Sequence, residues 1–348
     1  MTTFASEGVV VIGGVDTHAD VHVAAACDHL GGVRGTQSFA TTPAGYRALL
    51  AYLRSFGQLQ VVGVEGTGSY GSGLARHLAE HGVRVLEVNR PDRQARRAQG
   101  KSDVVDAIAA ARAVISGRAR VIPKSHNGTV EALRALQTVH RSARKARTQA
   151  LNQLHALVLT APDPIRGQLR ALTNRQLIIT CAGYRLAGDN LAAITKLALR
   201  ELAVRVRDLD AQITRLQAHR RRLITAAAPA LLAIYGVGPD TATALLLAAG
   251  DNPHRLTSDR SYSALLGASP IKASSGKTDR HRLNRGGDRH GNSALWTIVI
   301  TRMANQPATR AYVERRTKEG LSTPEIIRCL KRYVAREVFN ALPREALT

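Results

Sequence analysis

The first third of the chain alternates short apolar runs with helical patterns, and two of the apolar runs end in an acid. Val9 to Val15 is followed directly by Asp16, and Val61 to Val64 is followed directly by Glu65. Apolar runs of this length are typical of buried strands, and an acid at the end of a strand projects from the sheet edge. Two or three such oxygens can converge on a hard cation such as Mg²⁺. The alternation therefore predicts an α/β fold with acidic, candidate metal-binding residues at one edge of its sheet.

Two further acids, Asp103 and Asp106, lie in a segment that reads as the start of a helix. Ser102 is the expected N-cap. Residues three apart share one face of a helix, and the positive end of the helix dipole favours ionised carboxylates. Acids in a first turn are often only capping chemistry. Their occurrence together with Asp16 and Glu65 favours a shared metal site.

The order of the expected elements indicates the fold of this region. Three strands joined by tight turns suggest an antiparallel meander, and an alternating α/β half follows it. This order is typical of a ribonuclease-H-like domain, which we assign to residues 1–125. The expected strands are Val9 to Asp16, Val21 to Cys27, Thr36 to Ala40, Gln60 to Glu65 and Arg84 to Val88, and the expected helices are Ala44 to Phe56, Gly73 to His81 and one from Ser102.

The net charge points to a polyanionic partner. The chain has 49 Lys and Arg against 26 Asp and Glu, a formal charge of +23. Nucleic acid is the leading candidate partner. A membrane surface is the competing one, but there is no run of about 18 apolar residues and no signal-like N-terminus. We therefore expect a soluble, cytoplasmic protein. With 4% aromatic residues, phosphate contacts are expected to outweigh base stacking.

The cysteines do not suggest a metal or disulfide site. Cys27, Cys181 and Cys329 are far apart and show no paired spacing. We interpret them as small buried hydrophobic residues.

The sequence pattern of residues 126–228 is typical of long helices. Apolar side chains recur every three or four residues, which predicts a helical hairpin or coiled coil. A break is expected at Ala161 to Pro164. The basic runs Arg141 to Arg147 and His219 to Arg222 are expected on the outer face of this hairpin. They are either solvated faces or nucleic-acid contacts, and the charge excess favours contacts. The predicted seam consists of Leu202, Val206, Leu209, Ile213 and Leu216.

Residues 229–348 are expected to form a compact, mostly helical domain. Gly236-Val-Gly238 between two helical patterns is typical of a helix-hairpin-helix, in which turn amides bind a backbone phosphate. An ordinary glycine turn between packed helices explains the same residues equally well.

A serine-containing segment follows in the same region. Ser274 and Ser275 adjoin Gly276, so a hydroxyl can stand exposed beside cations that would neutralise a phosphate. By itself such a segment is more often a phosphate-binding loop than a nucleophile site. The neighbouring cations are Lys277, Arg280, Arg282, Arg285 and Arg289.

Taken in order, these motifs resemble those of the DEDD insertion-sequence transposases, which include pilin-gene-inverting and bridge-RNA-guided recombinases. The resemblance spans nearly the whole chain. It implies a RuvC-like N-terminal domain and a C-terminal transposase domain with a nucleophilic serine, which maps best onto Ser275, with Ser274 as the adjacent candidate. The motifs are Gly-Val-Asp16, Val-Glu65-Gly-Thr-Gly-Ser-Tyr, Lys-Ser-Asp103-Val-Val-Asp106-Ala, Gly-Val-Gly-Pro, Ser-Ser-Gly-Lys and Arg-Gly-Gly-Asp.

The resemblance also implies a mechanism and partners. Mg²⁺, with Mn²⁺ as the alternative, would be held by the carboxylates while the serine forms a covalent bond to a DNA end. The implied partners are donor and target DNA, a structured guide RNA, and further copies of the chain in a dimer or tetramer with composite sites. Residues 126–228 would then serve as a linker and oligomerisation region.

Three alternatives remain open from the sequence. Gly14-Val-Asp16 also resembles the first phosphate loop of actin-like sugar kinases, although such an enzyme has little use for this charge. A non-catalytic nucleic-acid-binding protein would share the charge but not need the acids. A metal-dependent nuclease of the Holliday-junction type would use the acids without covalent serine chemistry.

Overall fold

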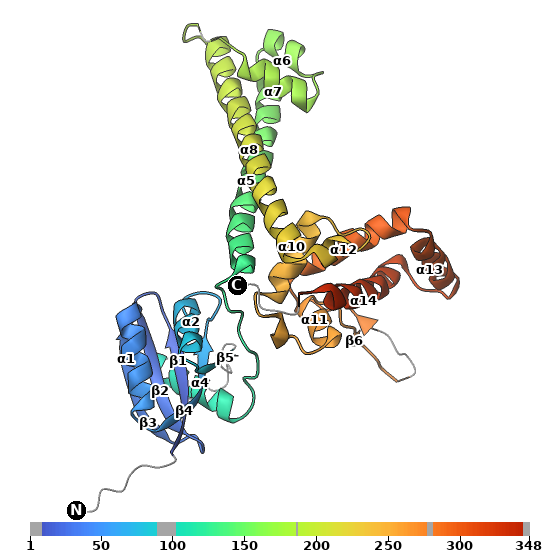
Figure 1. Cartoon of the computed structure of the whole chain (residues 1–348). Coiled ribbons are helices and arrows are strands. Elements are labelled where there is room, and N and C mark those ends of the chain that lie inside the picture. The colour runs from blue at the N-terminus through green and yellow to red at the C-terminus, as the bar shows by residue number, and fades with distance from the viewer. Residues whose placement is uncertain (1–8, 89–101, 186, 277–280, 344–348) are drawn as a thin grey trace, which may run out of the picture. The chain divides into compact units, whose positions relative to one another are not determined.

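The computed structural model describes residues 9–88, 102–185, 187–276 and 281–343, and it divides into two compact units (Figure 1). Within the described residues, the first unit comprises 9–128 and 249–257. The second comprises 129–248 and 258–343.

The first unit is built on a five-stranded mixed sheet with the strand order β3-β2-β1-β4-β5. The first three strands pair antiparallel, whereas β4 runs parallel to β1 and β5 parallel to β4. This arrangement is compatible with the expected ribonuclease-H-like fold. The strands are β1 (Val10–Thr17), β2 (Val21–Asp28), β3 (Val33–Ala40), β4 (Gln58–Glu65) and β5 (Arg84–Val88).

Two strands begin earlier than the sequence pattern indicated. β3 starts at Val33, which pairs with Cys27, and β4 starts at Gln58, which pairs with Val10. Pairing with a neighbouring strand extends both strands through polar residues that no apolar pattern marks.

Helices cover both faces of this sheet. α1 (Pro43–Arg54) and α2 (Ser72–Glu80) share one apolar core with the sheet, and α4 (Asp103–Ile115) packs on the opposite face. Thr42 caps α1, because its Oγ1 accepts a hydrogen bond from the Gly45 amide at 3.1 Å.

Two glycines let α4 lie close to the sheet. A Cβ atom at Gly14 would lie 2.2 Å from the carbonyl oxygen of Ala107. A Cβ atom at Gly63 would lie 2.9 Å from the carbonyl oxygen of Ala110. Only glycine fits at such distances, so these two positions set how near the helix approaches β1 and β4.

A segment that begins at the last residue of α10 (Pro239–Ala249) also belongs to the first unit. In residues 249–257, the buried Asn252 donates through Nδ2 to the carbonyl oxygen of Pro123 at 2.8 Å. The first unit is therefore discontinuous in the sequence.

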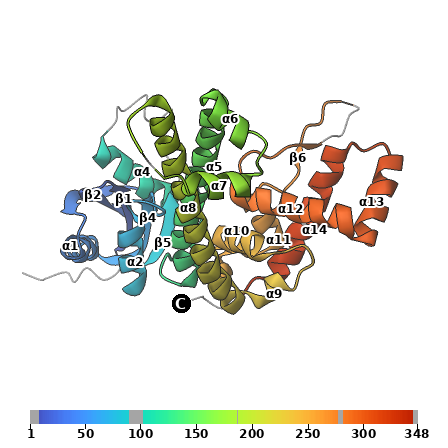
Figure 2. The same ribbon diagram turned by 90° about the horizontal axis from the view of Figure 1, so that it is seen from above.

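The second unit contains two long helices, α5 (Thr129–Thr160) and α8 (Leu191–Ala227), which run side by side (Figures 1 and 2). They form the expected helical hairpin. Of the predicted seam, Val206 is fully buried and the other four residues are half-buried. The expected break is occupied by two short helices, α6 (Asp163–Leu169) and α7 (Asn174–Ala182).

The rest of the second unit is mostly helical, as expected. Tyr262 is fully buried at its centre and donates through Oη to the carbonyl oxygen of Leu245 at 3.0 Å. None of the helices in the described ranges is both long and apolar enough to cross a membrane. The elements are α9 (Pro229–Leu232), α10 (Pro239–Ala249), the short helix η1 (Pro253–Arg255) in the first unit, α11 (Asp259–Leu265), β6 (Ile271–Lys272), β7 (His281–Arg282), α12 (Arg289–Asn305), α13 (Pro307–Lys318) and α14 (Thr323–Ala341).

Candidate functional site

Asp16 and Glu65 lie side by side at one sheet edge. Val15 pairs with Val64 in the parallel β1–β4 ladder, and the two acids are the next residues on their strands. In-register residues of parallel strands point to the same face. That face carries α4, because Gly14 and Gly63, two residues earlier, both face this helix. Asp16 is buried, and Glu65 is half-buried.

A hydrogen bond fixes the two strand ends relative to each other. Thr17 donates through Oγ1 to the carbonyl oxygen of Glu65 at 2.8 Å. The buried hydroxyl of Thr17 therefore holds the backbone that carries one acid against the backbone that carries the other.

The start of α4 brings the second pair of acids to the same face. Ser102 caps the helix as predicted, because its Oγ accepts from the Val105 amide at 3.2 Å. Asp106 is buried and Asp103 is exposed. Burial raises the pKa of Asp16, the imidazole of His18 opposes this effect, and the carboxylates of Asp106 and Asp103 raise the pKa further.

His18 was not among the residues that the sequence singled out. Its Nε2 lies 3.1 Å from Oδ2 of Asp16 and 3.4 Å from Oδ1 of Asp103. The three residues offer ligand atoms that all lie within 4.8 Å of one another. The available signal was the spacing Asp16-Thr-His18, which places both side chains on one face of an extended chain.

This donor set fits a divalent cation. Burying an acid beside like charges costs free energy, and a cation bound among them would offset that cost. Carboxylate oxygens are the ligands that Mg²⁺ and Mn²⁺ prefer. His18 contacts two of the carboxylates and can fix their orientation. Asp16, Asp103 and Asp106 therefore come together as predicted, with Glu65 beside Asp16; their metal-binding role stays a prediction.

The serines lie on a hairpin of the second unit. Ser274 and Ser275 follow β6, which pairs with β7, and both are exposed. Gly276 adopts φ +54°, a conformation that favours glycine. Arg282 lies in β7 and is exposed. Of the predicted phosphate-binding cations, Lys277 and Arg280 lie outside the described residues.

The glycine turn before α10 is closed by a hydrogen bond to a side chain in the first turn of that helix. Gly236 has φ +83°, and the Gly238 amide donates to Oγ1 of Thr241 at 3.0 Å. The preceding helix, α9, has four residues. Because the Gly238 amide already has a partner, the geometry favours the ordinary glycine turn; phosphate binding by Gly236 and Gly238 stays a prediction.

A buried arginine joins three helices close to that turn. It belongs to the basic run His219 to Arg222, so the expectation that this whole run lies on the outer face is wrong at Arg220. Arg220 of α8 is 2% exposed, and its Nη2 lies 2.9 Å from Oδ1 of Asp240 in α10. Its Nη1 lies 3.2 Å from Nδ1 of His140 in α5. Burial, and then the charge of Arg220, lower the pKa of His140, so its imidazole is neutral at pH 7 and accepts from the guanidinium.

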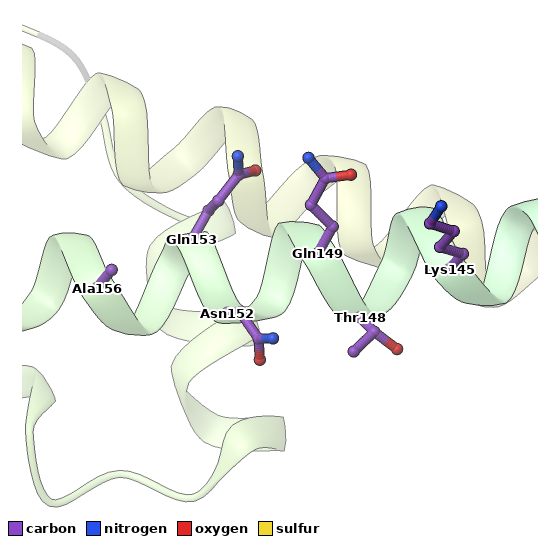
Figure 3. A pocket seen from close by; sticks show the side chains of 6 residues that line it. All are labelled: Lys145, Thr148, Gln149, Asn152, Gln153 and Ala156. Atoms are coloured by element: carbon purple, nitrogen blue, oxygen red, sulfur yellow. The ribbon is translucent and has the colours of Figure 1, made fainter.

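The long helix α5 also carries a shallow, open pocket (Figure 3). Its side chains are amides, a hydroxyl and one ammonium, which can bond to phosphate and sugar oxygens but offer no acid or imidazole for catalysis. The lining residues are Lys145, Thr148, Gln149, Asn152, Gln153 and Ala156.

Comparison with known proteins identifies both halves of the chain. Residues 13–161 match the family model of DEDD transposases of the IS110 type, described as "Transposase". Residues 228–314 match the model described as "Transposase IS116/IS110/IS902 family". No curated protein matches the chain. The first match contains the four predicted acids and the second contains both serines. The chain therefore belongs to the DEDD insertion-sequence transposase family and is an enzyme that recombines DNA.

Proposed function

We propose that this transposase cuts and rejoins DNA with a metal ion held by Asp16, Glu65, Asp103 and Asp106 and with Ser275 as a covalent nucleophile. The observation that carries the proposal is the convergence of Asp16, His18 and Asp103 within 4.8 Å at the edge where the buried Asp106 also lies. Mg²⁺ is the proposed ion and Mn²⁺ the alternative.

The chemistry follows from the types of residues. A bound Mg²⁺ supplies positive charge that stabilises the crowded phosphate of the transition state. Ser275 Oγ would lose its proton and attack phosphorus, and the bond from phosphorus to one deoxyribose oxygen would break as that oxygen takes up a proton. The resulting phosphoserine retains the energy of the phosphodiester, so rejoining needs no ATP. Ser274 is the adjacent candidate for the same role.

The distribution of charge supports nucleic-acid partners for the helical arm, which we define as residues 129–227. The arm contains 17 Lys and Arg against 6 Asp and Glu, a net charge of +11 out of the total of +23. A surface of this kind binds phosphates without reading sequence. We propose that the arm contacts DNA or a structured guide RNA that selects donor and target, and that the chain acts as a dimer or tetramer.

Trapping the covalent intermediate tests the serine. The parent protein is incubated with Mg²⁺ and a nicked suicide substrate and digested, and peptides are searched by mass spectrometry for a nucleotide adduct. We expect the adduct on Ser275. An adduct on Ser274 would move the assignment by one residue. Cleavage by the Ser274→Ala, Ser275→Ala double variant at the parental rate, with no adduct in the parent, would exclude serine catalysis.

The acids are tested separately. Alanine at Asp16, Glu65 or Asp103 is expected to abolish recombination in a plasmid assay while leaving nucleic-acid affinity nearly intact, because the cationic surface carries the binding. Asp106→Ala is expected to behave in the same way. Normal recombination by these variants would refute the metal site.

The second candidate function is a metal-dependent nuclease without covalent serine chemistry. It is favoured by the fact that Asp16, His18 and Asp103 all lie in the first unit, so hydrolysis by water would need no residue of the second unit. The same trapping experiment separates the two, because hydrolysis leaves nicks with free ends and no protein adduct.

A further inference from the structure

We propose that Asn292 and Lys331, together with Arg285 and Arg289, form a seat for one DNA phosphate close to the serine hairpin. This inference rests on the proposed function, because it assigns the seat to a phosphate near the one that is cut. Asn292 and Lys331 belong to α12 and α14, outside the serine segment.

The seat is a defined cavity of about 250 Å³ within the second unit. Among the described residues, its walls carry two guanidinium groups and two side-chain amides and no carboxylate. The backbones of Gly267 and Gly287 pack closely against each other in the cavity wall, since a Cβ at Gly287 would lie 2.1 Å from the Gly267 amide nitrogen. The polar lining consists of Asn284, Arg285, Arg289 and Asn292.

Asn292 is fixed in place by two hydrogen bonds. Its Nδ2 donates to the carbonyl oxygen of Leu266 at 2.7 Å, and its Oδ1 accepts from Nζ of Lys331 at 2.8 Å. A side-chain amide has two N–H groups, and the bond to Leu266 uses one of them. The other N–H can therefore donate to an acceptor in the cavity without any rearrangement of the side chain.

Lys331 acts through Asn292 and is a positioning residue. Its ammonium holds the amide oxygen, so the N–H groups of Asn292 must face the other way. Burial lowers the pKa of Lys331, and the contact that the structure gives its ammonium is with the amide oxygen of Asn292, not with a carboxylate. A half-buried ammonium without an acid partner is stabilised by an anion bound close to it.

The side chains of the cavity fit an anion that offers several oxygens, and for a transposase that anion is a phosphate of DNA. A guanidinium group matches phosphate oxygens with two parallel hydrogen bonds. Two backbone amides at the start of α12 already have a hydrogen-bond partner. The amides of His290 and Gly291 donate to Oδ1 of Asp288 at 2.9 and 2.8 Å. The arginines and Asn292 are therefore the donors, and the helix end is not.

The hairpin places this cavity near the serine. Ile271 pairs with Arg282 and Lys272 pairs with His281, so the cavity residue Leu283 lies at the base of the hairpin. Ser275 is four residues beyond Ile271, which pairs at that base, so the two residues are at most about 14 Å apart along an extended chain. A phosphate in the cavity is therefore a near neighbour of the phosphate that the serine attacks.

The first test measures the salt dependence of DNA binding by fluorescence anisotropy, with a fluorescein-labelled duplex of arbitrary sequence. Arg285→Gln with Arg289→Gln is expected to lower the slope of log affinity against log salt by about 0.9, the value for one lost phosphate contact. The matched control is Arg310→Gln with Lys318→Gln, which removes the same charge from exposed positions of α13. An equal loss of slope in the control would overturn the proposal.

The second test changes Asn292 and its positioning residue Lys331. Asn292→Leu is expected to weaken binding about tenfold with the slope unchanged, because it removes a contact but no charge. Lys331→Met is expected to weaken binding similarly, and Lys331→Arg to restore it, which loss of fold alone would not explain. Parental affinity in Asn292→Leu would overturn the proposal.

A third measurement locates the phosphate. Methylphosphonate, which is neutral, replaces one phosphate at a time in a strand that the parent cuts. We expect one position beside the cut to weaken parental binding, and Asn292→Leu to show no further loss at that position. If the parent forms the serine adduct but all positions affect Asn292→Leu and parent alike, the seat fails while the proposed function stands. If the salt tests succeed but the parent forms no adduct, the serine mechanism fails and the phosphate seat stands.

Discussion

Asp16 is a buried acid at the sheet edge with other carboxylates close to it. It is 6% exposed, it contacts His18, and burial together with two neighbouring carboxylates raises its pKa. An acid with a raised pKa in the folded chain binds its proton more tightly there than in the unfolded chain. Its ionised form therefore lowers the stability of the metal-free protein at neutral pH, and this cost falls as the pH drops through the folded pKa.

The cost of burying the ionised Asp16 gives a prediction for Asp16→Asn. We expect the metal-free variant to melt at a higher temperature than the parent at pH 7, because the amide carries no charge to bury. We also expect the variant to lose both strand cleavage and the rise in melting temperature that Mg²⁺ causes in the parent. Thermal melts with and without Mg²⁺ measure this. Asp20→Asn, at an exposed position near β1, is the control and should behave as the parent does; an unchanged Mg²⁺ effect in Asp16→Asn would contradict the metal site.

At the scale of elements, the packing of α4 on the sheet brings the acids together. Gly14 and Gly63 lie beneath this helix, where a methyl group would collide with its backbone. The sequence pattern shows both glycines inside apolar runs, but it does not show which element lies over them. The close approach explains why Asp106, in the first turn of α4, is buried beside Asp16.

The glycines can be tested through Gly14→Ala. Its Cβ would lie 2.2 Å from the carbonyl oxygen of Ala107, so α4 must move away from β1. We expect a loss of about 1 to 3 kcal/mol in the free energy of unfolding, together with weaker Mg²⁺ binding. Denaturant unfolding and Mg²⁺ titration measure the two effects. Gly68→Ala is the matched control, since no atom lies within 4 Å of the position of its Cβ; equal losses in both variants would refute the role of close packing.

The contact of α5, α8 and α10 gives another prediction at this scale. Arg220→Ala removes the bonds to Asp240 and His140 from the buried junction of these helices. The carboxylate of Asp240 is 59% exposed and stays hydrated without its partner, so we expect a loss of about 1 to 3 kcal/mol, mainly from emptying the buried position of Arg220. Arg221→Ala removes an exposed arginine of the same helix and should change stability by about 0.5 kcal/mol at most. Similar unfolding free energies for the two variants would show that the junction does not stabilise the unit.

At the scale of the whole molecule, the charge is distributed unevenly. The helical arm has a net charge of +11, whereas residues 1–128 have 14 Lys and Arg against 10 Asp and Glu, a net charge of +4. The domain with the acidic edge thus contributes little to the cationic surface. This separation explains why loss of an acid and loss of an arginine should have different effects, the first on cutting and the second on binding.

The charge predicts how the purified protein behaves. We expect it to carry RNA and to release it steeply as salt rises, since each phosphate contact contributes about 0.7 to 0.9 to the slope of log affinity against log salt. Filter binding across a salt series and sequencing of the bound RNA measure this. Arg144→Gln with Lys145→Gln, two exposed residues of α5, should lower the slope if the arm makes these contacts. A preparation free of nucleic acid, with salt-insensitive DNA affinity, would count against nucleic-acid binding by the arm.

The sequence by itself determined the elements and the candidate acids, because their signals are local. Apolar runs predict strands, the period of three to four residues predicts the long helices, and Asp16 and Glu65 are recognisable because each ends such a run. The capping roles of Thr42 and Ser102 were readable for the same reason. The two short helices between α5 and α8 were not, since a single proline-containing break marks the region.

Only the tertiary structure decided which side chains meet. His18 lies between Asp16 and Asp103 because α4 packs across β1, and Asn292 meets Lys331 because α12 packs against α14. The segment 249–257 joins the first unit although it begins at the last residue of α10. Such contacts join residues far apart in the sequence, and they depend on how whole faces pack together. A pattern confined to neighbouring residues carries no information about that packing.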